Sequence, residues 1–255
     1  MTGFWTLLYR EVNRFLRLAN QTILPPVIIA VLYLLIFGKS LGDRIGDIVE
    51  GVSYIHFIIP GLVMMSVISA AYQNTSSSFF IQRFQRSLDE LLVSSMSNFQ
   101  IVFAIVLGGM CRGTLVGILV SLICVVLVPG TAIASPFLAL FFIFMVALIF
   151  SCMGFVSAIW AESFDRLSLF QTYLLTPLIY LGGVFFRVSD LPGFWQMVAR
   201  ANPILYFVNG VRCGFLGTGV SEANLGVSVL ISLGLAGGLL ALCHHLFRIG
   251  YNIKS

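Results

Sequence analysis

The chain has 255 residues, of which 59% are hydrophobic and only 9% are charged. A soluble domain carries about 25% charged residues, because polar groups must cover its surface. The composition therefore argues against a cytosolic enzyme, a disordered chain and a disulfide scaffold. It predicts an all-α integral membrane protein that forms one transmembrane domain over residues 1–255. The net charge of +4 is small, and no nucleic acid partner is expected.

The N-terminal segment, residues 3–20, precedes the first apolar run and has amphipathic spacing. Leu8, Val12, Phe15 and Ala19 share one helix face at i, i+4 and i+7, and basic residues occupy another. This pattern predicts a helix that lies in the plane of the membrane interface. A simpler interpretation is a positively charged anchor that only sets the topology. The basic residues are Arg10, Arg14 and Arg17.

Six apolar segments are candidates to cross the hydrocarbon core, which takes about 20 residues of helix. Pro60 and Pro177 lie inside two of them, where neighbouring helices can support a local kink. The sequence therefore predicts six transmembrane helices. They are expected at residues 23–38, 52–72, 100–128, 136–160, 167–186 and 225–246.

Basic residues are distributed unevenly between the segments that connect these spans. Eight lie on the side that carries both termini, and five lie on the other side. Because cytoplasmic loops carry the excess of Lys and Arg, both termini are expected in the cytoplasm, with residues 43–50 and 190–200 outside. The eight are Arg10, Arg14, Arg17, Arg83, Arg86, Arg166, Arg248 and Lys254; the five are Lys39, Arg44, Arg187, Arg200 and Arg212.

The loop between the second and third spans contains a second amphipathic pattern, over residues 79–94. Phe84, Leu88 and Leu91 recur at helical spacing, and Asp89 and Glu90 lie on other faces. Such a helix can lie on lipid or insert into a groove of a partner protein. Its two acidic residues balance two basic ones, so attraction to anionic lipid is weak, and this balance favours a protein partner.

Arg112 is the only Lys, Arg, Asp or Glu within a predicted span. An unpaired arginine in the middle of a bilayer costs about 2.5–3.5 kcal/mol on insertion scales, so we expect it to face protein or water. It either lines a substrate path or extends to the headgroups. Gly109, Gly113 and Gly117 recur every four residues around it, a spacing that lets helices approach closely.

No motif for catalysis, metal binding or nucleotide binding stands in the chain. Phe37-Gly38-Lys39-Ser40 is similar to the end of a phosphate-binding loop, but that motif requires a glycine where Tyr33 stands. No paired carboxylates occur at membrane depth, as proton-driven transporters commonly need. We therefore expect no catalytic residue, metal or cofactor in this chain, and an energy source on another subunit.

Residues 187–205, after the fifth span, alternate apolar residues with helix breakers. They predict a re-entrant or interfacial hairpin outside, with Trp195 at headgroup level. Residues 207–219 are too interrupted to form a seventh span. Several residues from here and from the fifth span form one pattern over about 40 positions, including Pro177, Gly182, Gly183, Pro192, Pro203 and Arg212.

With this pattern, the motifs Arg10-Glu11, Pro25-Pro26, Pro60-Gly61 and Leu88-Asp89-Glu90-Leu91 make the chain resemble the permease subunit of type-2 ATP-binding-cassette (ABC) transporters over essentially its full length. The family's loop usually ends in proline, whereas this chain has Ser95-Met96 there. The resemblance implies six spans, a homodimer in the bacterial inner membrane among its lipids, and two copies of a cytoplasmic ATPase that uses ATP. It also implies outward transport of lipid-linked glycans, polysaccharides or hydrophobic drugs.

In this picture residues 79–94 form the coupling helix, residues 3–20 the interface helix, and residues 187–205 a cap over the exit. Two other functions stay open on the residues alone. One is a secondary transporter or channel that acts without an ATPase, and the other is a membrane-embedded enzyme that modifies lipids. Both of these functions predict carboxylates or a nucleophile at membrane depth, and the sequence has neither. A neighbouring gene for a P-loop ATPase would favour the ABC permease.

Overall fold

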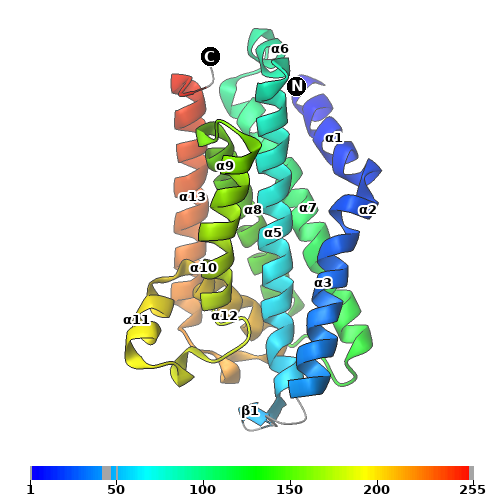
Figure 1. The fold of residues 1–255 in the computed structure, drawn as a ribbon, viewed down its shortest axis with the longest axis vertical. Coiled ribbons are helices and arrows are strands. Elements are labelled where there is room, and N and C mark those ends of the chain that lie inside the picture. Colours follow the sequence, from blue (N-terminus) through cyan, green and yellow to red (C-terminus); the bar gives the residue numbers. More distant parts are fainter. Residues whose placement is uncertain (1, 42–46, 50, 253–255) are drawn as a thin grey trace.

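The computed structural model describes residues 2–41, 47–49 and 51–252, and nearly all of them are helical (Figure 1). In the first half of the chain the helices are α1 (Thr2–Arg17), α2 (Ala19–Thr22), α3 (Leu24–Leu35), α5 (Tyr54–Phe84), α6 (Ser87–Val93) and α7 (Asn98–Leu127). The second half contains α8 (Pro136–Trp160), α9 (Phe164–Leu169), α10 (Thr176–Leu181), α11 (Gly193–Ala201), α12 (Pro203–Leu216) and α13 (Leu225–Ile249).

Short elements connect or extend these helices. Two π-helical segments, η1 (Ile36–Leu41) and η2 (Phe170–Leu175), continue α3 and join α9 to α10. The 3-10 turns are η3 (Val188–Asp190) and η4 (Thr218–Val220). Strands β1 (Asp47–Val49) and β2 (Val52–Ser53) form a small antiparallel pair, with Val49 opposite Val52. The predicted outer loop 43–50 falls partly outside the described residues.

Five helices of the described chain are long and apolar enough to cross a membrane: Ala19–Gly38, α5, α7, α8 and α13. The sixth predicted span, 167–186, is not one regular helix but the succession α9, η2 and α10, which ends at Leu181. Pro177 has no N–H for a regular helical bond, and the Thr176 N–H reaches back five residues to the Gln171 oxygen. The π segment therefore absorbs the break that proline imposes.

The helices stand side by side along the long axis of the molecule (Figure 1). The two termini and α6 lie at one end, and β1 and α11 lie toward the other (Figure 1). Below, these are called the terminal end and the distal end. The succession α9–η2–α10 stands in this bundle as a column beside α5 and runs from the terminal end toward the distal end (Figure 1).

Helix α5 forms the centre of the bundle and packs mainly against α7 and α8. The glycines of α7 explain how closely these helices approach, since a Cβ on Gly113 would lie 2.7 Å from the Ala71 Cβ of α5. At Gly117 it would lie 2.5 Å from Val67 Cγ2 and 3.1 Å from Ile143 Cγ2, so larger residues would push α5 and α8 away. The predicted role of the glycines in close packing is confirmed.

Candidate functional site

A groove of about 250 Å³ opens between α3, α5, α7 and η2. Its walls mix apolar side chains with three glutamines, two serines and one arginine. The groove can therefore hold a molecule with both polar and apolar parts. Its lining consists of Gln21, Pro25, Pro26, Ile29, Ala30, Tyr33, Leu62, Met65, Ser66, Ser69, Gln73, Arg112 and Gln171.

Arg112 is the charged residue of this groove and stands half-way along α7, at position 15 of its 30 residues. Only 6% of it is exposed. Its Nη2 donates a hydrogen bond of 2.8 Å to the backbone oxygen of Thr22. In a regular helix that oxygen would accept from residue 26, which is a proline without an N–H. Pro26 thus frees the acceptor that holds the guanidinium in the groove wall.

Three aromatic side chains gather around Tyr33, at the distal part of α3. The hydroxyl groups of Tyr33 and Tyr180 lie 2.9 Å apart and join α3 to α10. Phe185 packs against both rings, with centroid distances of 5.4 and 5.8 Å, and Phe37 lies 5.2 Å from Phe185. Because Tyr33 also lines the groove, this aromatic cluster lies next to the groove, toward the distal end.

Helix α1, which covers most of the predicted interface helix, is fixed to the bundle by the buried carboxylate of Glu11, to which the sequence assigned no role. Glu11 is 1% exposed and accepts hydrogen bonds from Ser78 Oγ (2.6 Å) and Gln82 Nε2 (2.9 Å) of α5. The sequence does contain a sign of this role, because Glu11 lies four residues from Leu7 and four from Phe15, and both of these are buried. The centre of the buried face is therefore Leu7, Glu11 and Phe15. Of the predicted face, Phe15 is buried, and Leu8 and Val12 are half-buried.

Two of the three basic residues of α1 contact α5, and the third is exposed. Arg14 lies 3.3 Å from Glu11 Oε2 and donates to the Asn74 backbone oxygen at 3.1 Å, and Arg10 donates to Gln82 Oε1 at 2.9 Å. Burial lowers the pKa of Arg14, and the Glu11 carboxylate partly offsets that effect. Arg17 is exposed. Two of the three predicted arginines thus hold α1 against α5.

The predicted coupling helix over residues 79–94 is not a single helix. Helix α5 continues to Phe84, Arg86 adopts a left-handed conformation with φ of 58°, and the short α6 follows. The stripe of Phe84, Leu88 and Leu91 is therefore wrong, because the break at Arg86 leaves Phe84 on α5 and puts Leu88 and Leu91 on α6. Leu88 is 2% exposed and packs inside this chain, Leu91 is partly buried, and Phe84 is 77% exposed.

The exposed side chains around this break form a surface at the terminal end, called here the coupling surface. It contains the apolar residues Phe84, Leu92 and Val93 and the acidic residues Asp89 and Glu90. A polar hollow of about 340 Å³ adjoins it, between α5, α6 and Glu162. Arg83 bonds the Ile159 and Ala161 oxygens at the end of α8, so α5 and α8 are joined beneath this surface.

The hairpin predicted at 187–205 consists of η3, α11 and the first residues of α12. Asn202 Nδ2 donates to the Leu178 oxygen at 2.6 Å, and its Oδ1 caps α12. Helix α12 then returns toward the distal end, where the Gly214 oxygen accepts from the Ser135 N–H at the start of α8. Residues 203–216 form a buried helix that the sequence analysis treated as interrupted chain.

Arg212, which was counted as a loop residue, is fully buried in α12. Its Nη2 donates to the Gly183 oxygen at 2.7 Å, its Nη1 lies 3.7 Å from Glu222 Oε1, and its Cζ stands 3.9 Å from the Phe57 ring centroid. Glu222 in turn accepts from the Val188 N–H at 2.8 Å. The arginine thus ties the turn after α10 to α5 and to the loop before α13.

Unlike Arg212, the other residues of the sequence pattern act through their effect on the backbone. Pro177 produces the π segment, Pro192 precedes α11, and Pro203 begins α12. Gly183 has a φ of +74°, a conformation that favours glycine. A Cβ on Gly182 would lie 2.6 Å from Ile204 Cγ2, so this position needs a residue without one. These residues shape the distal end and do not line the groove.

Comparison with known proteins gives the family. Residues 2–216 match the family model described as ABC-2 type transporter. The chain belongs to the ABC-2 transporter family. It is 42% identical to the inner membrane transport permease YadH of Escherichia coli K12 over 246 residues, which cover 96% of this chain and 94% of that protein. It is also 27% identical to nodulation protein J of Rhizobium meliloti, over 84% of this chain and 81% of that protein.

As a member of the ABC-2 family, the chain is a membrane permease subunit of an ABC transporter, and the resemblance drawn from its sequence is confirmed. The family also explains why the sequence contains no P-loop motif. In these transporters ATP is hydrolysed by a separate subunit, so family membership implies a cytoplasmic ATPase partner.

Proposed function

We propose that two copies of this ABC-2 permease and two copies of a cytoplasmic ATPase form an exporter in the inner membrane of a bacterium. ATP is the cofactor of the partner ATPase and not of this chain. In this proposal α9–η2–α10 is the sixth crossing, and the terminal end faces the cytoplasm. The placement of both termini and α6 at one end, together with the excess of basic residues there, supports this orientation.

The observation that carries the proposed transport path is Arg112 in the groove. A buried guanidinium half-way along α7, with Gln21, Gln73 and Gln171 around it, offers hydrogen-bond donors to an anionic or polar group. The apolar wall beside them suits the hydrophobic part of the same molecule. We therefore expect an amphiphilic substrate that carries a negative charge, and the aromatic cluster would separate it from the distal side.

Replacing Arg112 with leucine tests this path. A hydrogen bond to a charged group contributes about 1.5–3 kcal/mol, so the variant should transport an anionic amphiphile about ten to a hundred times less efficiently. Arg112→Lys, which keeps the charge, is the matched control and should retain a larger share of activity. The measurement is ATP hydrolysis and transport by the permease–ATPase complex in liposomes, after a screen for amphiphiles that stimulate hydrolysis. Unchanged transport by Arg112→Leu would show that this residue only packs.

Co-purification separates this function from a transporter or channel that acts alone. The permease, co-expressed with the ABC ATPases of its own genome, should retain one of them through affinity and size-exclusion steps, in a ratio of one to one. A chain that moves solute in liposomes without any ATPase would support the channel instead.

Cysteine labelling tests the orientation. In a background without the five native cysteines, Gly193→Cys at the exposed start of α11 should react with a membrane-impermeant maleimide added outside intact cells. Ser95→Cys, exposed after α6, should react only after the membrane is opened. Labelling in the opposite sense would reverse the proposed orientation.

A further inference from the structure

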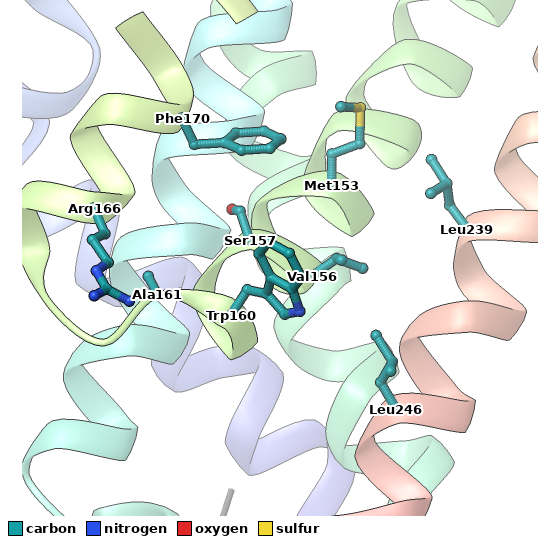
Figure 2. Close-up of a pocket in the computed structure, with 9 residues that line it drawn as sticks. All are labelled: Met153, Val156, Ser157, Trp160, Ala161, Arg166, Phe170, Leu239 and Leu246. Atoms are coloured by element: carbon teal, nitrogen blue, oxygen red, sulfur yellow. The ribbon is translucent and has the colours of Figure 1, made fainter. Parts of the chain in front are cut away.

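A second cavity, of about 400 Å³, lies between α8, the segment α9–η2 and α13. It shares no lining residue with the groove around Arg112. Met153 and Val156 of α8 lie between Leu239 and Leu246 of α13 on one side and Phe170 of η2 on the other (Figure 2). Its walls are almost entirely apolar, and its size is that of a pocket for a small molecule.

Helix α13 packs against α8, α12 and α7 and contributes one wall of the cavity. The buried residues of α13 are small except for Phe247, and large apolar residues such as Leu239 and Leu246 are only partly buried. Trp160, at the end of α8, is 72% exposed and lines the cavity. Tryptophan is the residue that membrane proteins place at headgroup level, so this side chain marks the depth of the cavity mouth.

The mouth of the cavity is polar. An adjoining recess shares Trp160 and Arg166 with the cavity and adds Glu162, Tyr251 and Asn252. In Figure 2 the Arg166 side chain stands at one edge, beside Ala161 and Trp160. Arg166 Nη1 lies 2.7 Å from Glu162 Oε2, so the mouth presents one charge of each sign. An apolar body with a polar mouth at the terminal end matches an amphiphile whose head lies at that surface.

We propose that this cavity binds one zwitterionic phospholipid from the leaflet at the terminal end. An acyl chain fills the apolar body, the phosphate pairs with Arg166, and a primary ammonium of the headgroup pairs with Glu162. A lipid with a net negative charge, such as phosphatidylglycerol, would bring its phosphate to Arg166 but would offer Glu162 no cationic partner, because its glycerol headgroup is uncharged. Free phosphate would leave the apolar body without a partner. The proposal concerns a bound lipid and does not depend on the transported substrate.

Lipid retention by the purified full-length permease tests the site. The protein, in mild detergent, is incubated with equal amounts of phosphatidylethanolamine and phosphatidylglycerol that carry the same acyl chains, and the lipid that stays bound is measured by native mass spectrometry. We expect one phosphatidylethanolamine per chain, favoured about tenfold over phosphatidylglycerol. Glu162→Gln should bring the two lipids to about equal retention, because it removes the partner of the ammonium.

Two pairs of variants separate the body of the site from its mouth. Leu239→Trp fills the cavity and should reduce retained lipid about tenfold, whereas Leu242→Trp, on the same helix but outside the cavity, should not. Arg166→Gln should lower retention, whereas Arg248→Gln, an exposed arginine in the last turn of α13, should not. Arg166 is exposed enough that its variant should fold, which size-exclusion chromatography checks.

Three results would overturn the proposal. The first is equal retention of both lipids by the unaltered protein. The second is a loss of bound lipid in Leu242→Trp and Arg248→Gln as large as that in Leu239→Trp and Arg166→Gln. The third is that the purified permease retains no lipid at all.

Discussion

Replacing Arg212 with methionine should destabilise the permease by about 3–5 kcal/mol. The substitution removes one partner of a buried ion pair and leaves Glu222, with only 7% of its side chain exposed, as an uncompensated charge. The Gly183 oxygen also loses its donor at 2.7 Å, and the Phe57 ring loses the cation above it. Gly183 and the Phe57 ring are buried, so water does not replace the partner that they lose.

The measurement is unfolding of the purified permease in mixed micelles with an increasing fraction of denaturing detergent. Arg200→Met is the matched control, because Arg200 is exposed at the end of α11, and it should change the unfolding free energy little. The double variant Arg212→Met with Glu222→Gln should recover part of the loss, since a neutral amide can still accept from the Val188 N–H. Stability of Arg212→Met equal to that of the control would show that the pair contributes nothing.

Replacing Phe84 with aspartate should abolish most ATPase binding while the permease stays folded. Phe84 is 77% exposed and Val93 88% exposed, and both lie on the coupling surface, next to Asp89 and Glu90. Large apolar residues at the centre of an interface commonly contribute 2 kcal/mol or more, so we expect an affinity about thirty times lower. Val93→Asp should act in the same direction, because it places a charge in the same contact.

A substitution at the buried Leu88 should affect folding and not ATPase binding alone. Because it is 2% exposed and packs inside this chain, Leu88→Asp should lower the yield of folded permease whether or not an ATPase is present. Binding is measured by titrating the purified ATPase against permease in nanodiscs. If Phe84→Asp and Val93→Asp both bind with unaltered affinity, the coupling surface is not the docking site. The exposed aromatic residues of α1, Trp5 and Tyr9, then become the better candidates.

Both predictions concern places where the sequence alone led to a different expectation. The stripe of Phe84, Leu88 and Leu91 assumed one unbroken helix, and helical spacing gives no sign of a left-handed residue at Arg86. Arg212 was counted with the loops because glycines interrupt the apolar run around it. Those glycines instead allow close packing, since a Cβ on Gly214 would lie 2.7 Å from the Ala139 nitrogen.

The sequence by itself determined the membrane class, the approximate place of the five long apolar helices, the close packing at Gly113 and Gly117, and the family. These properties follow from composition and from local periodicity, which neighbours along the chain define. Only the tertiary structure decided which polar groups meet: Glu11 with Ser78 and Gln82, Arg112 with Thr22, and Arg212 with Gly183 and Glu222. In an apolar surrounding each buried polar group must find a partner, and the partner it finds depends on how the helices pack.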